Sequence, residues 1–309
     1  MARPASDPSL VQSHSFRGVA AIDRSERELT TDDAHRLFVR YYQPASGAAV
    51  RTLLIVHGLS EHGERYDHVA RFFVERRWRV VVGDLRGHGR SSGTPAHIGD
   101  FRRYVSDLES IRSRFAAEPA GTALLGHSMG GLIAIHHALA YPRRVAALAL
   151  SSPLLRISVP ISRPTLALGR ILSLVAPRAR FRSGVDPADT TRCEATLARR
   201  AADPLMRRSL TAGLFFAMQS ALADAWIGAS AIRLPVFIAQ AGADRIVDPQ
   251  AATDWARNLG SDNVECRQLA EHYHEVLNEP DWPETAACMA DWLERRTAAP
   301  QHGLARYAA

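Results

Sequence analysis

The sequence predicts an α/β fold: a mostly parallel central sheet with helices on both faces and a helical cap insertion. Short continuous apolar runs, which are typical of strands buried on both faces of a parallel sheet, alternate with longer segments of helical spacing. The alternation stops between residues 153 and 230, where the apolar spacing is helical, and it resumes at 235–239. Alternating strands and helices of this kind favour right-handed crossovers between parallel strands.

The elements follow from the period of the apolar residues, which is two in strands and 3.6 in helices. The first two predicted strands, 16–22 and 37–42, are expected to pair as a hairpin. The remaining predicted strands are 51–56, 79–83, 122–125, 145–150, 235–239 and 263–269. The predicted helices of the core are 66–78, 104–115, 129–141, 250–259 and 284–295.

This order divides the chain into a core in two parts and one insertion. The first part of the core is expected at 16–152 and the second at 231–297, with the helical cap, or lid, at 153–230. Residues 1–15 and 298–309 are polar or small and are expected to be flexible termini. At 309 residues, the chain is long enough for a buried sheet and a sizeable insertion.

The composition is that of a globular protein without an obvious nucleic-acid footprint. Hydrophobic residues make up 46% of the chain, and the formal net charge is +6. All 38 basic residues are arginine, because the sequence contains no lysine, and they are scattered among 32 acidic residues. Nucleic-acid binding would favour a basic run or stripe, so we expect no nucleic-acid partner.

The cysteines and the N-terminus predict a reduced, cytoplasmic protein. The three cysteines, Cys193, Cys266 and Cys288, are widely spaced, which argues against a disulfide framework or a structural zinc site. Residues 1–20 lack the apolar run of a signal peptide. No stretch of about 18 consecutive apolar residues predicts a membrane-spanning helix.

The strongest local signal is a candidate nucleophile at Ser128. The segment Gly126-His-Ser128-Met-Gly130 fits the pattern G-x-S-x-G and lies between a predicted strand and a predicted helix. A tight strand-to-helix turn would expose the hydroxyl at the carboxyl end of the sheet, where α/β folds bind ligands. The alternative is a helix N-cap serine with glycines nearby.

A serine hydroxyl needs a base, and the base needs an orienting acid. Folds of this kind supply them in the chain order serine, acid, histidine. His274, in the loop before the last predicted helix, is the predicted base, with His272 as the alternative. Asp244 follows strand 235–239 and is the predicted acid unless it is only a turn residue, whereas Asp248, before a proline, is expected to be an N-cap.

An oxyanion formed on the substrate needs two backbone N–H donors. One is the amide of Met129, which follows the nucleophile. The other is expected from the loop after strand 51–56, through the amide of Leu59.

Several segments together resemble one family, the monoglyceride lipase and lysophospholipase branch of the α/β-hydrolases. The likeness extends from about residue 16 to 294 and is carried by residues 57–66, 83–93, 126–131 and 273–279, with support from 202–205 and 243–248. The resemblance implies an α/β-hydrolase fold, the triad Ser128, Asp244 and His274, and the amides of Leu59 and Met129 as the oxyanion hole. It also implies a helical cap over an apolar acyl tunnel.

The same resemblance assigns further positions to pocket shape and loop structure. Leu59 stands where the family often has a small residue, which affects the shape of the pocket and not the backbone donor. The remaining polar residues of the two glycine-rich segments are expected to hold loops and not to react; they are His57, Glu61, His62, Asp84, Arg86 and His88.

The predicted activity is hydrolysis of a carboxylic ester, most simply a monoacylglycerol or a lysophospholipid, with no metal and no organic cofactor. A serine peptidase or amidase, or a carbon–carbon bond hydrolase, is the alternative within the fold, and a binding module that has lost catalysis is a third. The arginine-rich cap disfavours a substrate amine. Residues 166–175 are apolar with arginines at both ends, which predicts either a cover over the pocket or transient, peripheral contact with a membrane surface.

Overall fold

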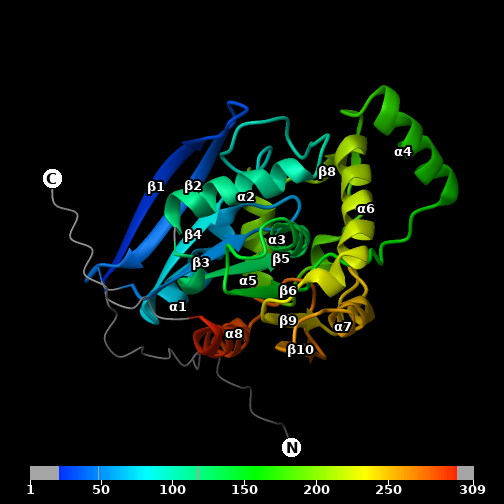
Figure 1. Ribbon diagram of the computed structural model, residues 1–309. Helices are drawn as coiled ribbons and strands as arrows, with labels where there is room; N and C mark the ends of the chain where they lie inside the picture. The colour runs from blue at the N-terminus through cyan, green and yellow to red at the C-terminus, as the bar shows by residue number, and fades with distance from the viewer. Residues whose placement is uncertain (1–20, 48, 117, 298–309) are drawn as a thin grey trace, which may run out of the picture.

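The computed structural model describes residues 21–47, 49–116 and 118–297, and its centre is one twisted sheet (Figure 1). Within these residues the sheet has eight strands. In spatial order they are β1 (Ile22–Thr30), β2 (Arg36–Pro44), β4 (Trp78–Gly83), β3 (Arg51–Val56), β5 (Thr122–His127), β6 (Ala147–Ser151), β9 (Val236–Ala241) and β10 (Val264–Leu269). The pairs β1–β2 and β2–β4 are antiparallel and the other pairs are parallel, which confirms the predicted fold class.

Helices cover both faces of the sheet because its central strands are apolar on both sides. In β3, Leu54 and Val56 belong to one buried cluster, and Leu53 and Ile55 belong to the cluster on the opposite face. The helices α2 (Arg102–Phe115), α3 (Met129–Ala140) and α7 (Pro249–Arg257) pack into the first cluster. The helices α1 (Asp67–Glu75) and α8 (Trp282–Arg296) pack into the second.

The predicted first strand is wrong in position. The strand β1 begins at Ile22 and ends at Thr30, whereas the prediction was 16–22, and residues 16–20 lie outside the described part of the chain. A hairpin with β2 is present, but its first strand is β1 and not the predicted 16–22. The strand was missed because β1 is an edge strand with mostly exposed side chains, so its sequence carries no apolar run.

Between β6 and β9 the chain leaves the sheet and forms an insertion. It contains α4 (Arg163–Val175), β7 (Arg180–Arg182), α5 (Glu194–Ala202), β8 (Ser209–Thr211) and α6 (Ala212–Ile227). The insertion contains the helices that its apolar spacing predicts. The short antiparallel pair of β7 and β8 was not predicted, because a three-residue strand is too short to show an apolar period. Figure 1 shows α4 at the outer edge, separated from the sheet by α6.

Short 3₁₀ helices complete the connections, and one of them, η1, follows directly on the loop after β3. They are η1 (Gly63–Tyr66), η2 (Pro119–Gly121), η3 (Pro187–Asp189) and η4 (Ala229–Ala231). Among the described residues, no helix is long and apolar enough to cross a membrane.

Candidate active site

Ser128 occupies a strained turn between β5 and α3. Its backbone angles are φ 51° and ψ −119°, a conformation that costs a non-glycine residue of the order of 1–3 kcal/mol. The turn is tight enough to require glycine on both sides. A Cβ at Gly130 would lie 2.1 Å from the carbonyl oxygen of Val56, and one at Gly126 would lie 2.5 Å from that of Gly130. The G-x-S-x-G pattern is therefore explained by close backbone packing.

The loops after β9 and β10 bring Asp244 and His274 together. The Nδ1 atom of His274 lies 2.7 Å from Oδ2 of Asp244. The other oxygen of Asp244 accepts hydrogen bonds from the backbone N–H groups of Ile246 (2.9 Å) and Val247 (3.0 Å). These three contacts fix the carboxylate and leave Nε2 of the imidazole as the nitrogen that can act as a base.

Electrostatics in this pair favour an ionised acid beside a basic imidazole. Burial disfavours the charged form of both groups, but the attraction between them outweighs it. The pKa of the Asp244 carboxyl is lowered by the neighbouring His274 and by the backbone N–H groups. The pKa of His274 is raised by the Asp244 carboxylate.

Ser128 and His274 line the same cavity, which has a volume of about 570 Å³. Leu59 and Glu61 line it too, so the loop after β3, the turn after β5 and the loop after β10 meet there. Most of the wall is apolar and comes from the insertion; it includes Ile157, Leu166, Phe181, Phe215, Phe216 and Met218. This volume is within the usual range of about 300–1,000 Å³ for small-molecule sites.

The alternative residues lie elsewhere. The Nε2 atom of His272 is 3.1 Å from Oδ1 of Asp281, and His272 is not part of the cavity wall. Asp248 is the N-cap of α7, as predicted, because its carboxylate accepts a hydrogen bond from the backbone N–H of Gln250.

Side chains with purely structural contacts hold the loop that follows β3. The Nε2 atom of His57 accepts a hydrogen bond from the backbone N–H of Leu85 (2.9 Å). Its proton is therefore on Nδ1, which donates to the carbonyl oxygen of Gly58 (2.8 Å). The Glu61 carboxylate accepts the backbone N–H of Gly58 (2.5 Å). These bonds fix the backbone of Gly58, directly before Leu59 and beside Ser128.

The second glycine-rich segment is likewise held by buried contacts. Asp84 accepts hydrogen bonds from Arg40 (2.7 Å) and from the backbone N–H groups of Gly63 and Arg90 (both 2.8 Å). Arg86 pairs with Asp33 and Asp107, and burial lowers the pKa of His88 to about 3. None of these three residues lines the cavity, and His62 instead pairs with Asp203 of the insertion (2.6 Å).

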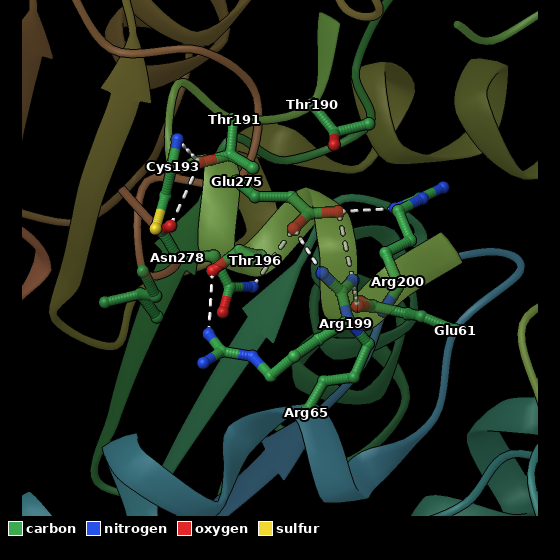
Figure 2. A network of polar contacts seen from close by, with 12 residues as sticks. Glu61, Arg65, Thr190, Thr191, Cys193, Thr196, Arg199, Arg200, Glu275 and Asn278 are labelled. Carbon is green, nitrogen blue, oxygen red and sulfur yellow. Dashed lines mark hydrogen bonds and ion pairs between the residues drawn. The ribbon is translucent and has the colours of Figure 1, made fainter. Parts of the chain in front are cut away.

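A buried network of charges at the polar end of the cavity was not found from the sequence (Figure 2). Arg65 donates to Glu61 and, through two N–H groups, to Glu275 (3.0 and 2.6 Å). Arg200 of α5 donates to the same carboxylate of Glu275 (2.7 Å). Both glutamates have a lowered pKa because the attraction of Arg65 outweighs their burial. Glu275 lies 210 residues from Arg65 and 75 from Arg200, so no local pattern signals these pairs.

No metal centre accompanies this site in the described residues. Nowhere among them do three or more His, Cys, Asp or Glu side chains gather in a way that could hold a metal ion.

The sheet order, the strained serine turn and the insertion between β6 and β9 define an α/β-hydrolase. The chain belongs to the family Hydrolase_4, described as serine aminopeptidase, S33, which matches residues 47–281. The predicted likeness to the monoglyceride lipase branch is confirmed by the relatives below.

Two curated relatives illustrate this likeness. A monoacylglycerol lipase of Mycolicibacterium smegmatis is 29% identical over 245 residues, which cover 78% of this chain and 87% of the relative. Phospholipase YtpA of Bacillus subtilis is 28% identical over 234 residues, which cover 75% of this chain and 90% of the relative. The crystal structure of a monoacylglycerol lipase from Paleococcus ferrophilus has the same fold, with a TM-score of 0.76 at 24% identity over 90% of this chain and 100% of that one.

Proposed function

We propose that the protein is a serine esterase that hydrolyses single-chain lipid esters such as monoacylglycerols or lysophospholipids. Ser128 is the nucleophile, His274 the general base and Asp244 the residue that orients it. The observation that carries the proposal is the shared cavity: the strained Ser128 and the Asp244-bound His274 line one apolar pocket. The relatives named as monoacylglycerol lipase and phospholipase support the substrate class.

The chemistry follows the order of proton transfers in a serine triad. His274 takes the proton of the Ser128 hydroxyl through Nε2, and the alkoxide attacks the ester carbonyl. The backbone N–H groups of Met129 and Leu59 stabilise the oxyanion, a contribution of roughly 3–4 kcal/mol for each such donor. His274 then protonates the leaving alcohol, and a water molecule activated by the same imidazole releases the fatty acid.

The insertion supports a lipid substrate. We propose that residues 153–230 form a cap whose apolar side chains hold the acyl chain. Phe181 of β7 and Phe215 and Met218 of α6 line the cavity, whereas Ser128 and His274 come from the core. An acyl chain lies against the apolar wall when the carbonyl is at Ser128, so a substrate with a long chain buries more apolar surface than a short one.

The direct test is Ser128→Ala, assayed for fatty acid release from a panel of monoacylglycerols and p-nitrophenyl esters of increasing chain length. Turnover should fall by about a million-fold, as for the loss of other triad serines. Ser113→Ala, an exposed serine of α2, is the matched control and should keep full activity. A fluorophosphonate probe should label the wild type and Ser113→Ala but not Ser128→Ala. Ester cleavage that survives in Ser128→Ala removes the basis of the proposal.

The family description makes aminopeptidase activity the second candidate. Recognition of a substrate amine favours free carboxylates, and the cavity wall has two, Glu61 and Glu275. Both are paired with Arg65, which leaves little acceptor capacity for an ammonium group. We therefore expect faster cleavage of a p-nitrophenyl ester than of an aminoacyl p-nitroanilide. The reverse preference would favour the peptidase.

We also propose that α4 lets the protein attach to a membrane surface. The helix has no buried residue. Vesicles with an anionic lipid should sediment the wild type at low salt, because Arg163 and Arg170 lie among the apolar side chains. Leu174→Asp should weaken sedimentation, and the control Ile227→Asp, at the exposed last residue of α6, should not. Equal binding by all three proteins would contradict the proposal. The large apolar side chains of α4 that are more than half exposed are Leu168, Ile171, Leu174 and Val175.

A further inference from the structure

The polar end of the cavity contains two carboxylates whose oxygens are already in use. In Glu61, Oε1 accepts from the backbone N–H of Gly58 (2.5 Å) and from the Tyr66 hydroxyl (2.8 Å), and Oε2 accepts from Arg65 (2.5 Å). The residue is buried, with 3% of its surface exposed. A ligand donor that approached Glu61 would have to displace bonds that hold the loop beside Ser128.

Glu275 is occupied in the same way. Its Oε1 accepts from Arg65 (3.0 Å) and from Arg200 (2.7 Å), and its Oε2 accepts from Arg65 (2.6 Å) and from the Asn278 amide (3.1 Å). Figure 2 shows Arg65 and Arg200 approaching the carboxylate from different elements. The acceptors at this end of the cavity are thus satisfied by the protein itself.

The hydrogen-bond donors at this end of the cavity are only partly used, because most N–H groups of Arg200 have no acceptor among the residues that the structure describes. A guanidinium carries five N–H groups. In the described part of the chain, Arg200 uses Nη1 for Glu275, and its Nε and Nη2 atoms have no protein acceptor. Its side chain is 14% exposed and belongs to the cavity wall. The unused donors are available to a ligand in the cavity.

The charged side chains around the cavity carry a net positive charge, which also favours an anion. Arg200 is joined in the wall by Arg180 and Arg182 of β7, against the two carboxylates of Glu61 and Glu275. Those two carboxylates are compensated by Arg65, from outside the wall, together with Arg200. Among the described residues, neither Arg180 nor Arg182 forms an ion pair with a carboxylate; Arg180 instead donates to the carbonyl oxygen of Pro95 and to the hydroxyl of Ser209. A ligand in this cavity therefore meets an excess of positive charge.

We infer that Arg200 is a specificity-determining residue that binds an anionic group, a phosphate or a carboxylate, on the alcohol part of the ester. The inference rests on the proposed esterase function. The alcohol must leave beside His274, and Arg200 is bonded to Glu275, the next residue along the chain. A planar guanidinium can offer two parallel N–H groups to such an anion. Because the acyl chain lies against the apolar wall, the alcohol part of the ester lies at the polar end of the cavity.

The test compares esters that share one acyl chain and differ in the alcohol. Decanoyl glycerol is neutral, decanoyl glycerol phosphate carries a phosphate, and decanoyl lactate carries a carboxylate. We expect the wild type to have a higher kcat/KM for at least one anionic ester than for the neutral one, and the two anionic arms identify which anion it is. Arg200→Gln should lower the ratio of anionic to neutral kcat/KM by about tenfold or more, as expected for a charge-assisted hydrogen bond.

Arg199→Gln is the matched control. Arg199 is the preceding arginine on α5, is exposed, and donates to the hydroxyl of Thr196 (2.9 Å) instead of lining the cavity (Figure 2). Its replacement should leave the ratio unchanged. Arg200→Lys keeps the charge without the planar pair of donors, so its ratio should fall less than that of Arg200→Gln. Equal losses on neutral and anionic esters in both Arg200 variants would make Arg200 a structural residue and overturn the inference.

A binding measurement separates this inference from the proposed activity. Calorimetry with dodecyl phosphate, in the Ser128→Ala background, should show binding that weakens about tenfold or more with Arg200→Gln and falls with added salt. If no ester is cleaved but this binding depends on Arg200, the esterase proposal fails and the anion site stands. If esters are cleaved and binding is the same with and without Arg200, the anion site is refuted and the esterase stands.

Discussion

Removing the guanidinium of Arg65 should expose how much the buried charge network contributes to stability. In Arg65→Met, the apolar stem is kept and three hydrogen bonds to carboxylates are lost, one to Glu61 and two to Glu275. The carboxylates stay buried, with 3% and 4% of their surfaces exposed. Breaking a buried ion pair on one side typically costs about 3–5 kcal/mol, because the remaining charge is uncompensated. Glu275 keeps Arg200, so we expect a loss within this range and not twice as large.

The loss of stability in Arg65→Met should depend on pH, and the ionisation of the two carboxylates sets the direction of this dependence. In the wild type, the pKa of Glu61 and that of Glu275 are lowered, so the stabilisation is present above their unfolded value of about 4.3 and is lost as pH falls through the folded pKa. Without Arg65, burial raises both pKa values, and protonation relieves the uncompensated charge. The difference in unfolding free energy between variant and wild type should therefore shrink from pH 7 to pH 5.

The assay is urea and thermal unfolding of both proteins at the two pH values. At about 2 °C per kcal/mol, the lower end for large domains, the Tm at pH 7 should fall by roughly 6–10 °C. Arg71→Met is the control, since Arg71 forms an exposed ion pair with Asp67 that should be worth less than about 1 kcal/mol. An equal loss in the control, or a loss that does not change with pH, would refute the reasoning.

Three further predictions concern the turn and the triad. Gly130→Ala should destabilise the protein by about 3 kcal/mol, because the new Cβ would clash with the carbonyl of Val56, whereas Gly99→Ala, which meets no atom within 4 Å, should change the urea midpoint little. Asp244→Asn should lower kcat by about 10⁴-fold with the fold intact by circular dichroism, since the wrong tautomer of His274 is then favoured; near-normal turnover would exclude Asp244 as the orienting residue. The acid limb of the pH profile of kcat/KM should lie above the ordinary histidine value of about 6.5, because the pKa of His274 is raised, and activity should rise with pH through that limb. A limb near pH 5 would contradict this.

Much of the fold could be predicted because its signals are local. The strand β3 has the predicted bounds, since a strand buried on both faces shows a near-continuous apolar run, here Leu53 to Val56. The turn at Ser128 could be recognised because backbone clashes require glycine at 126 and 130. The edge strand β1 and the pair β7–β8 escaped detection, since an exposed strand and a three-residue strand leave no apolar period to detect.

By itself, the sequence determined the alternation of buried strands and helices in the core and the chemical types at the site: a serine in a glycine-flanked turn, an aspartate after one strand and a histidine after another. Only the tertiary structure decided that Asp244 contacts His274 while His272 faces Asp281. It also revealed that Arg65 and Arg200 saturate the carboxylates beside the cavity. The physical reason is the sequence distance over which each interaction acts. Strand and turn propensities depend on a few neighbouring residues, whereas these ion pairs join side chains as far as 210 residues apart, so tertiary packing selects the partners.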